Sequence, residues 1–360
     1  MLEKRFKAAV LEKNNSKLAI KDILFSDELK KGQIFVKLKY TGICGKQIDE
    51  IEGIGGKDPF MPHLLGHEGS GVVIEVGPGV KKVKKKDKVV LHWIKSNGIE
   101  SVTPKYFSKN NIVNAGWITT FNEYAVVSEN RVTKIPKGYS LKKSCLFGCV
   151  ATTALGLVNY ELKLKKKDTL LVVGVGGLGQ IIVQAAKNYN VKKIIAIDLN
   201  NFALNKAKML GADEIINVRK PTSFEKLKKL KINKTVITTG NIFAIEKAIE
   251  STSIPGTCFI MGVPKRKENI KINAWNIMHD QTIRGSLGGN AFPKRDIPKF
   301  IDLDKKGKIL DIGSGTGHFL KRGIERGWDC LGFEPSKIAY NYSKNTLGLN
   351  VVNDFFNGNN

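Results

Sequence analysis

The sequence predicts an α/β protein in which a β-rich N-terminal domain precedes a doubly wound parallel sheet. Before residue 150, short strand-like segments alternate with Gly, Pro and Asn turns, as at residues 33–40, 70–77 and 123–127. After residue 150, short apolar runs alternate with helix-like segments, a pattern typical of βαβ units. Near residue 307 another strand, glycine loop and helix begin, which predicts a partial third domain.

Six segments are expected to form the parallel sheet. Each is a short apolar run between helix-like stretches. They are residues 170–174, 193–198, 214–217, 235–239, 258–263 and, as an additional strand, 282–289.

Composition excludes several classes of protein. No apolar run approaches the roughly 18–20 residues of a membrane span, and the N-terminus lacks a secretory signal, so a cytoplasmic protein is expected. Lys and Arg total 59 against 33 Asp and Glu, a formal charge of +26, but the excess is lysine spread along the whole chain. This distribution argues against a specific nucleic-acid site, where arginine would be expected.

The five cysteines are too few and too scattered for a disulfide framework. Metal binding, catalysis and core packing therefore stay open for each of them. Cys145 and Cys258 have apolar neighbours in the sequence, so both are expected in the core.

Three residues can form a metal site. His67, in Gly-His-Glu, offers an imidazole, Cys44 lies in a glycine-flanked bend, and Cys149 is expected at a helix N-terminus, which favours a thiolate. A Cys–His–Cys set leaves a fourth zinc position open for substrate, as catalytic zinc requires. Taken singly, such a histidine is more often a loop residue and such cysteines are more often core residues.

A glycine loop predicts a dinucleotide site. The loop lies between a strand and a helical segment, where backbone N–H groups can approach a pyrophosphate. Its glycines are Gly174, Gly176, Gly177 and Gly179. Asp198 ends the next strand, where a carboxylate binds ribose hydroxyls and repels a 2′-phosphate, so NAD is favoured over NADP.

Residues 5–307 resemble the zinc-containing alcohol dehydrogenases of the medium-chain family. The motif GHE-x2-G-x5-G-x2-V matches at 66–80, and TGICG and GC-x3-T-x2-G occur in the family's order. The resemblance implies that Cys44, His67 and Cys149 bind a catalytic zinc ion, with Glu68 as the nearby carboxylate, and that hydride passes between an alcohol and NAD.

The resemblance also implies the domain boundaries. Residues 1–150 would form a GroES-like catalytic domain and residues 151–290 a Rossmann domain that binds NAD. Residues 291–307 would begin the return to the catalytic domain, and residues 308–360 would form a truncated methyltransferase-like fragment.

Two departures from the family pattern concern the metal chemistry. No cysteine lies between residues 44 and 145, so the structural zinc of many relatives is expected to be absent. Lys46 and Gln47 stand where relatives carry a Ser or Thr proton relay and an Asp. Lys46 can replace the relay if burial near zinc makes its amine less basic; otherwise the relay runs elsewhere. His92 and Trp93 fall at substrate-pocket positions of the family, although core or surface roles are equally expected.

Residues 308–356 resemble the start of a class I S-adenosylmethionine-dependent methyltransferase. The resemblance implies a site for S-adenosylmethionine in the glycine loop and at the end of the next strand. Its residues are Asp311, Gly313, Gly315, Gly317 and Glu334. The remaining strands of such a domain are missing, which favours a chimera of two genes over a bifunctional enzyme.

Three functions therefore stay open. The first is a zinc- and NAD-dependent dehydrogenase of an alcohol or polyol, including sugar derivatives, with a small-molecule substrate and a dimeric or tetrameric assembly implied by the family. The second is a methyltransferase remnant or fusion. The third is a nucleotide-binding chimera without activity.

Overall fold

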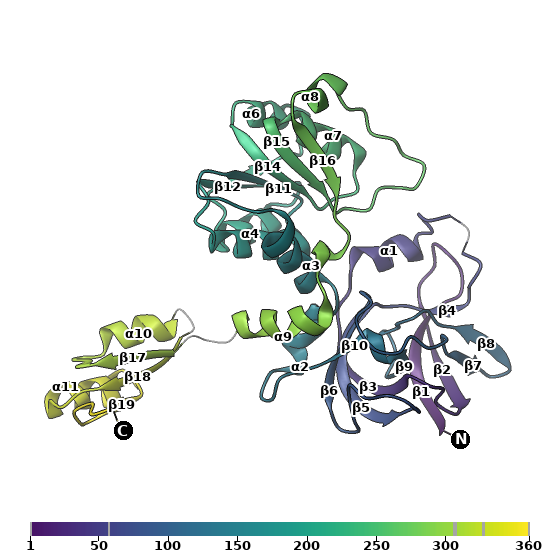
Figure 1. Ribbon diagram of the computed structural model, residues 1–360, viewed down its shortest axis with the longest axis horizontal. Coiled ribbons are helices and arrows are strands. Elements are labelled where there is room, and N and C mark those ends of the chain that lie inside the picture. Colours follow the sequence, from purple (N-terminus) through teal and green to yellow (C-terminus); the bar gives the residue numbers. More distant parts are fainter. Residues whose placement is uncertain (1, 57, 305–307, 326–327, 359–360) are drawn as a thin grey trace. The chain divides into compact units, whose positions relative to one another are not determined.

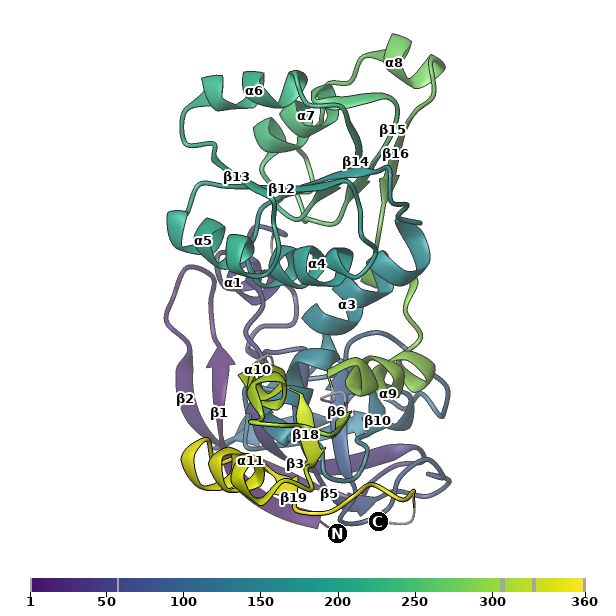
Figure 2. The same ribbon diagram turned by 90° about the vertical axis from the view of Figure 1, so that its left-hand side faces the viewer.

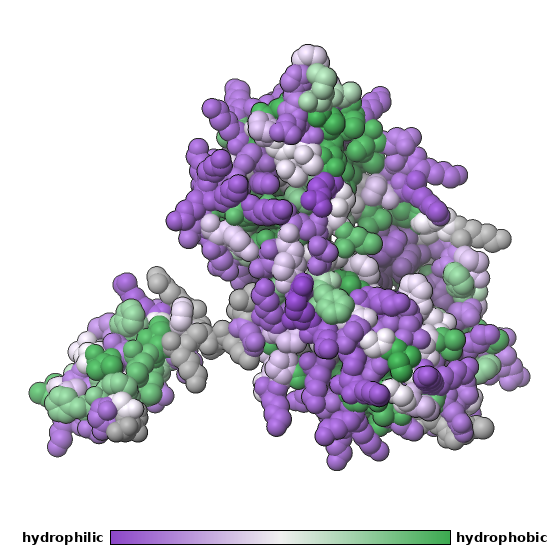
Figure 3. All heavy atoms as spheres, in the orientation of Figure 1, coloured by the Kyte–Doolittle hydropathy of each residue, from purple (hydrophilic) through white to green (hydrophobic). Residues whose placement is uncertain are grey.

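The computed structural model describes residues 2–56, 58–304, 308–325 and 328–358 (Figure 1). The chain divides into two compact units, Met1–Pro298 and Lys299–Asn360. Among the residues described, no single helix is long and apolar enough to cross a membrane; one bent pair, Leu141–Gly148 with Val150–Glu161, passes on length and composition alone. Hydrophilic side chains cover most of the face of the first unit seen in Figure 3, as expected for lysines spread along the chain.

The N-terminal part of the first unit consists of a closed barrel and a five-stranded sheet. The barrel strands are, in order, β1 (Leu2–Leu11), β2 (Ala19–Asp27), β7 (Lys105–Ser108), β8 (Asn111–Asn114) and β4 (His63–Leu64). The sheet order is β10 (Val132–Lys134), β6 (Lys88–His92), β5 (Glu68–Val76), β3 (Gln33–Thr41) and β9 (Tyr124–Ser128). Alternate residues of these strands point inward and form two apolar clusters, as a period of two requires.

Three helices complete this N-terminal part of the first unit. They are α1 (Gly45–Ile51), α2 (Leu141–Ser144) and α3 (Val150–Gly156). Helix α1 directly follows β3, and α3 directly precedes the second half of the first unit. Helices α1 and α3 both begin next to a cysteine: Cys44 is the N-cap residue of α1, and Cys149 is the N-cap residue of α3.

The second half of the first unit is a six-stranded parallel sheet with helices on both faces (Figure 2). The strand order is β13 (Glu214–Asn217), β12 (Lys193–Asp198), β11 (Thr169–Val173), β14 (Ile232–Ile237), β15 (Thr252–Ile260) and β16 (Gln281–Gly285). All six predicted segments contribute strands, including the additional one at 282–289.

Alternate residues of the central strands pack against opposite helical layers. Helices α4 (Gly177–Lys187) and α5 (Asn201–Met209) cover one face, and α6 (Glu225–Lys228) and α7 (Ile242–Glu250) cover the other. In β11, for example, Leu170 packs on the first side and Leu171 on the second. Cys258 belongs to the core on the α7 side, and Cys145 is also buried, so both predictions of core cysteines are confirmed. Helices α8 (Ala274–Met278) and α9 (Pro293–Asp304) flank β16 in the sequence.

The second unit is a small three-stranded parallel sheet with two helices. Its strands, in order, are β17 (Lys308–Ile312), β18 (Asp329–Phe333) and β19 (Val351–Val352), and its helices are α10 (His318–Glu325) and α11 (Lys337–Asn341). Leu320 of α10 packs on Cys330, Leu349 and Val351. Leu310 and Ile312 of β17 are 47% and 59% exposed, so this sheet does not bury its apolar side chains fully.

Candidate active site

The three predicted metal ligands lie together in the first unit. One donor atom each from Cys44, His67 and Cys149 lies within 4.8 Å of the other two. Cys44 follows β3, His67 precedes β5, and Cys149 precedes α3. The antiparallel pairing of β3 with β5 brings the first two residues together, and the close approach of residue 148 to β6 brings in the third.

The glycine before Cys149 makes this approach possible. A Cβ atom at Gly148 would lie 2.3 Å from the carbonyl oxygen of Leu91 and 2.6 Å from Cβ of Glu68. Any larger residue would therefore push α3, and Cys149 with it, away from the sheet.

The donor set fits a zinc ion. His67 Nε2 is buried and has no hydrogen-bond partner among the described residues, while Nδ1 contacts the side-chain nitrogen of Gln47 at 2.5 Å. An unpaired buried nitrogen is costly unless a ligand binds it. Two sulfur atoms and this nitrogen are donors that zinc prefers, and a three-residue set leaves one position for substrate.

A hydrogen bond couples the two thiols in the metal-free chain. A hydrogen bond from the Cys149 thiol lowers the pKa of Cys44 well below its usual range, and His67 lowers it further. The same hydrogen bond, together with burial, raises the pKa of Cys149. In the metal-free chain the neighbouring Cys44 and burial thus act against the effect of the helix N-terminus, and the expected Cys149 thiolate stays a prediction.

Glu68 lies beside the metal site and is 2% exposed. Its Oε2 atom accepts a hydrogen bond from the backbone N–H of Val150 at 3.2 Å, at the start of α3. Burial raises the pKa of Glu68 to about 7, although this hydrogen bond acts in the opposite direction. Gly42 leaves room for the carboxylate, since a Cβ atom there would lie 2.3 Å from Glu68 Oε1.

A cavity of about 540 Å³ adjoins the metal site. Gln47 and His67 form one end of it, and the other walls combine aromatic and polar side chains, among them Phe60, Trp117, Glu50, Asp58 and His63. His63 Nε2 and Asp58 Oδ2 are paired at 2.9 Å. Burial raises the pKa of Glu50, whose carboxylate has no hydrogen-bond partner among the described residues.

His92 and Trp93, which fall at substrate-pocket positions of the family, lie in different surroundings. His92 is fully buried, with Nε2 3.0 Å from Thr133 Oγ1 and Nδ1 2.7 Å from the carbonyl oxygen of Ile94, so the core interpretation holds for it. Trp93 Nε1 is buried without a hydrogen-bond partner and lies near Cys149, whose pKa it lowers slightly against the larger effects. Lys46 is half-buried in the first turn of α1.

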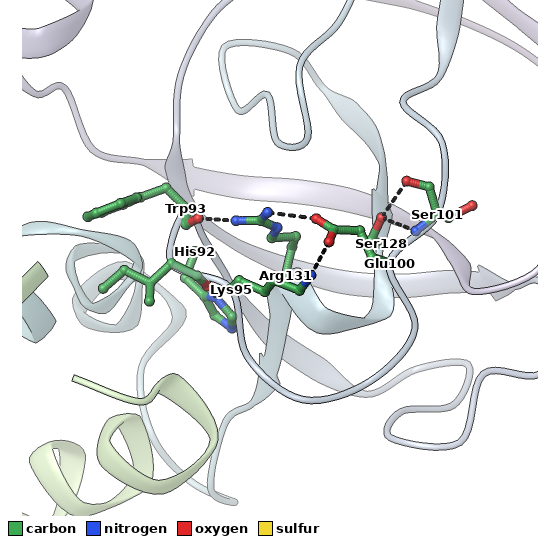
Figure 4. A network of polar contacts seen from close by, with 8 residues as sticks. His92, Trp93, Lys95, Glu100, Ser101, Ser128 and Arg131 are labelled. Carbon is green, nitrogen blue, oxygen red and sulfur yellow. Dashed lines mark hydrogen bonds and ion pairs between the residues drawn. The ribbon is translucent and has the colours of Figure 1, made fainter. Parts of the chain in front are cut away.

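Ion pairs hold the loop that follows β6 (Figure 4). The guanidinium of Arg131, which is 5% exposed, donates to the carbonyl oxygen of Trp93 and to Glu100 Oε1, the latter at 2.9 Å. Lys95 donates to the other carboxylate oxygen of Glu100. Arg131 also lies over the ring of Trp117, 4.9 Å from its centroid. The network therefore connects the backbone beside the metal site to a wall of the cavity.

The glycine loop has the shape that a dinucleotide site needs. Gly174 has φ of +83°, and a Cβ atom at Gly179 would lie 2.1 Å from the Gly174 carbonyl oxygen, so the start of α4 packs tightly on β11. A Cβ atom at Gly176 would meet nothing within 4 Å, which leaves its backbone open to a ligand. Asp198 Oδ2 accepts from the Val175 N–H at 2.8 Å, so the carboxylate lies against the loop.

The second unit contains a similar local arrangement. Gly313, Gly315 and Gly317 all have positive φ between β17 and α10. Glu334 follows β18, and its Oε2 atom accepts from the Gly315 N–H at 2.6 Å. The structure therefore brings the predicted glycine loop and glutamate together, while binding of S-adenosylmethionine there stays a prediction.

Sequence reasoning missed two residues of the site. In the sequence, Gln47 stands out only as a departure from the family pattern, and no motif singles out Glu50. Both lie on α1, three residues apart, so they share the face that meets the cavity. Gln47 and Glu50 follow the cap residue Cys44 by three and six residues, and this helical spacing indicates in the sequence that they lie on the same side of the helix as Cys44.

Comparisons with known proteins agree with this architecture. Residues 30–137 match the alcohol dehydrogenase GroES-like domain, and residues 177–306 match the zinc-binding dehydrogenase domain. Alcohol dehydrogenase 6 of Peromyscus maniculatus is 31% identical over 332 residues, covering 82% of this chain and 87% of that protein. S-(hydroxymethyl)glutathione dehydrogenase of Photobacterium damsela subsp. piscicida is 28% identical, covering 78% and 84%.

A solved structure shows the same fold. The alcohol dehydrogenase zinc-binding domain protein from Burkholderia ambifaria superposes with a TM-score of 0.76 at 21% identity, covering 96% of this chain and 97% of that one. The fold is thus a GroES-like domain followed by a Rossmann-type domain. Family membership implies zinc and NAD(H) as cofactors. The chain belongs to the zinc-dependent alcohol dehydrogenase family of oxidoreductases.

Proposed function

We propose that this chain oxidises a small polar alcohol with NAD, or reduces the matching carbonyl compound, at a single zinc ion held by Cys44, His67 and Cys149. The observation that carries the proposal is the convergence of the three donor atoms around a buried His67 Nε2 that has no other partner. When bound there, zinc polarises the substrate oxygen and lowers the pKa of the alcohol.

The surrounding residues have distinct roles in this proposal. Glu68 holds the start of α3 through the Val150 N–H and places a buried carboxyl group beside the ligands. Trp93 Nε1, which is buried beside Cys149, would donate a hydrogen bond to the sulfur of Cys149 when that residue binds zinc.

The coenzyme would lie across the glycine loop, with its pyrophosphate at the N-terminus of α4. Gly176 leaves the backbone open there, since a Cβ atom at this residue would meet nothing within 4 Å. Asp198 keeps acceptor capacity for the ribose hydroxyls, because each carboxylate oxygen has two lone pairs and the two backbone N–H groups, of Val175 and Asn200, use one on each. The negative charge favours NAD over NADP.

The cavity beside His67 suggests the kind of alcohol. Its wall includes the partly buried carboxylate of Glu50, which makes no side-chain hydrogen bond to the described residues and would accept one from a hydroxyl group. An aliphatic alcohol would leave that carboxylate without a partner. A polyol or sugar derivative therefore fits the cavity better than an unsubstituted alcohol.

We further propose that the chain binds no second zinc ion. The sequence has no cysteine between residues 44 and 145. The loop after β6 is instead held by Arg131, Glu100 and Lys95 (Figure 4). These contacts link Trp93 and Lys95 at the start of the loop to Glu100 and to Arg131 beyond it, and a structural metal would likewise tie loop segments together.

Metal analysis of purified variants tests the ligand assignment. We expect one zinc ion per chain in the wild type and none retained in Cys44→Ala or His67→Ala. Both variants should still bind NADH, because the glycine loop contains none of the ligands. Cys258→Ala, which removes a buried thiol far from the site in sequence, is the matched control and should keep its zinc.

Full zinc content in both ligand variants would refute the assignment. Two zinc ions per wild-type chain would refute the absence of a second site. Loss of zinc together with loss of NADH binding in the ligand variants would point to unfolding, and their thermal unfolding curves would identify it.

A further inference from the structure

The side chain of Gln47 connects two of the three proposed zinc ligands. It is 2% exposed. Its Oε1 atom accepts from the backbone N–H of Cys44 at 3.2 Å, and its Nε2 atom lies 2.5 Å from His67 Nδ1. Within the described residues this is the hydrogen bond that the His67 ring makes.

The position of Gln47 follows from the helix that carries it. Gln47 is the third residue of α1, and its side chain reaches back to the N–H of the cap residue Cys44, as in a capping box. The Cys44 side chain in turn faces the N–H of Gln47. In the metal-free chain the amide is therefore held at its oxygen end by the Cys44 N–H while its nitrogen end faces the His67 ring.

We propose that Gln47 is a positioning residue of the metal centre, which rests on the zinc site proposed above. Its hydrogen bond to Nδ1 turns the ring so that Nε2 faces the two sulfur atoms. A ligating histidine is generally oriented by a partner on its other nitrogen, and removal of that partner weakens metal binding about 10- to 100-fold.

A carboxamide serves this position less well than a carboxylate would. Metal on Nε2 places the ring proton on Nδ1, which then needs an acceptor. The amide oxygen already accepts from the Cys44 N–H, and the amide nitrogen is not an acceptor. Gln47 must therefore turn its oxygen toward the ring and give up the Cys44 bond when the metal binds. A glutamate could accept from both groups at once.

The proposal predicts the order of zinc affinity among variants of equal length at position 47. Gln47→Met keeps the volume but removes both hydrogen bonds, and should weaken zinc binding about 10- to 100-fold. Gln47→Glu should tighten it about tenfold, because it supplies charge-assisted acceptors to both groups. Competition with a chromophoric chelator measures the dissociation constant for zinc without any assay of turnover.

Two controls separate positioning from folding. Ile48→Ala alters a half-exposed neighbour on the same helix and should leave the zinc affinity unchanged. Thermal unfolding of the metal-free variants checks that each one folds. The visible spectrum of the cobalt-substituted variants should change with Gln47→Met, because it reports the geometry of the ligand set.

Each outcome decides the proposal. Wild-type affinity in Gln47→Met would overturn it, because packing alone would then suffice. Weaker binding in Gln47→Glu than in the wild type would also overturn it, because an acceptor to both groups would then be harmful. Failure of the wild type to bind zinc would instead refute the proposed function itself, and the inference with it.

Discussion

Replacement of Asp198 by alanine should relax the preference of the enzyme for NAD over NADP. Both oxygen atoms of this carboxylate are anchored: Oδ2 accepts from the Val175 N–H and Oδ1 from the Asn200 N–H, each at 2.8 Å. The charge therefore cannot turn away from a ligand on the glycine loop. A 2′-phosphate on the ribose would be held next to it.

The size of the effect follows from Coulomb's law. Two unit charges about 5 Å apart repel by about 3 kcal/mol at an effective dielectric constant of about 20. Asp198 is only partly buried, and salt screens exposed charges, so about half of this repulsion should survive. A penalty of about 1.5–2 kcal/mol corresponds to roughly a 10- to 30-fold discrimination against NADPH.

Fluorescence titration with NADH and with NADPH measures this discrimination as a ratio of dissociation constants. The ratio is the informative quantity, because loss of the Val175 and Asn200 hydrogen bonds should weaken the binding of both coenzymes. Glu214→Ala is the matched control: it removes one carboxylate from the first residue of the neighbouring strand β13, whereas Asp198 ends β12.

An unchanged ratio in Asp198→Ala would refute the reasoning and show that Asp198 only supports the loop. An equal change in the ratio for Asp198→Ala and Glu214→Ala would also refute it, because the effect would then come from net charge alone.

Two further predictions concern the buried His92 and the cavity. Burial lowers the pKa of His92 from 6.5 to about 3, so its contribution to stability is present above pH 6.5 and is lost as the pH falls toward 3. The free energy of unfolding should fall by up to about 1.4 kcal/mol for each unit by which the pH decreases. In urea unfolding between pH 4 and 7, His92→Gln should therefore show a flatter pH dependence than the wild type, and parallel curves would contradict this. In the cavity, Glu50→Leu should lower kcat/KM for 1,2-butanediol about tenfold relative to 1-butanol, through loss of one hydrogen bond to a charged group; an unchanged ratio would remove Glu50 from substrate recognition.

Local patterns made the dinucleotide site predictable. The loop, the helix and the strand that ends at Asp198 follow one another within a short stretch of sequence, and the loop glycines are required by contacts with their own neighbours. A Cβ atom at Gly179 would collide with the Gly174 carbonyl oxygen, for example. Because strand, turn and helix are formed by adjacent residues, the sequence pattern already contains the geometry.

The zinc ligands needed more than a local pattern. Cys44, His67 and Cys149 are far apart in the sequence, and spacing alone left core cysteines and a loop histidine open. Family resemblance selected them, and strand pairing of β3 with β5 together with the close approach at Gly148 brings them to one point.

Taken by itself, the sequence determined the order of the two domains and the strands of the parallel sheet, because these depend on periodicity and short motifs. The candidate ligands came from the resemblance of its motifs to those of a known family. Only the tertiary structure decided that Gln47 meets His67, that Glu50 lines the adjoining cavity and that a hydrogen bond couples the Cys44 and Cys149 thiols. Hydrogen bonding and burial control these three properties. Both depend on residues that the fold brings together from distant segments, so no pattern along the chain could reveal them.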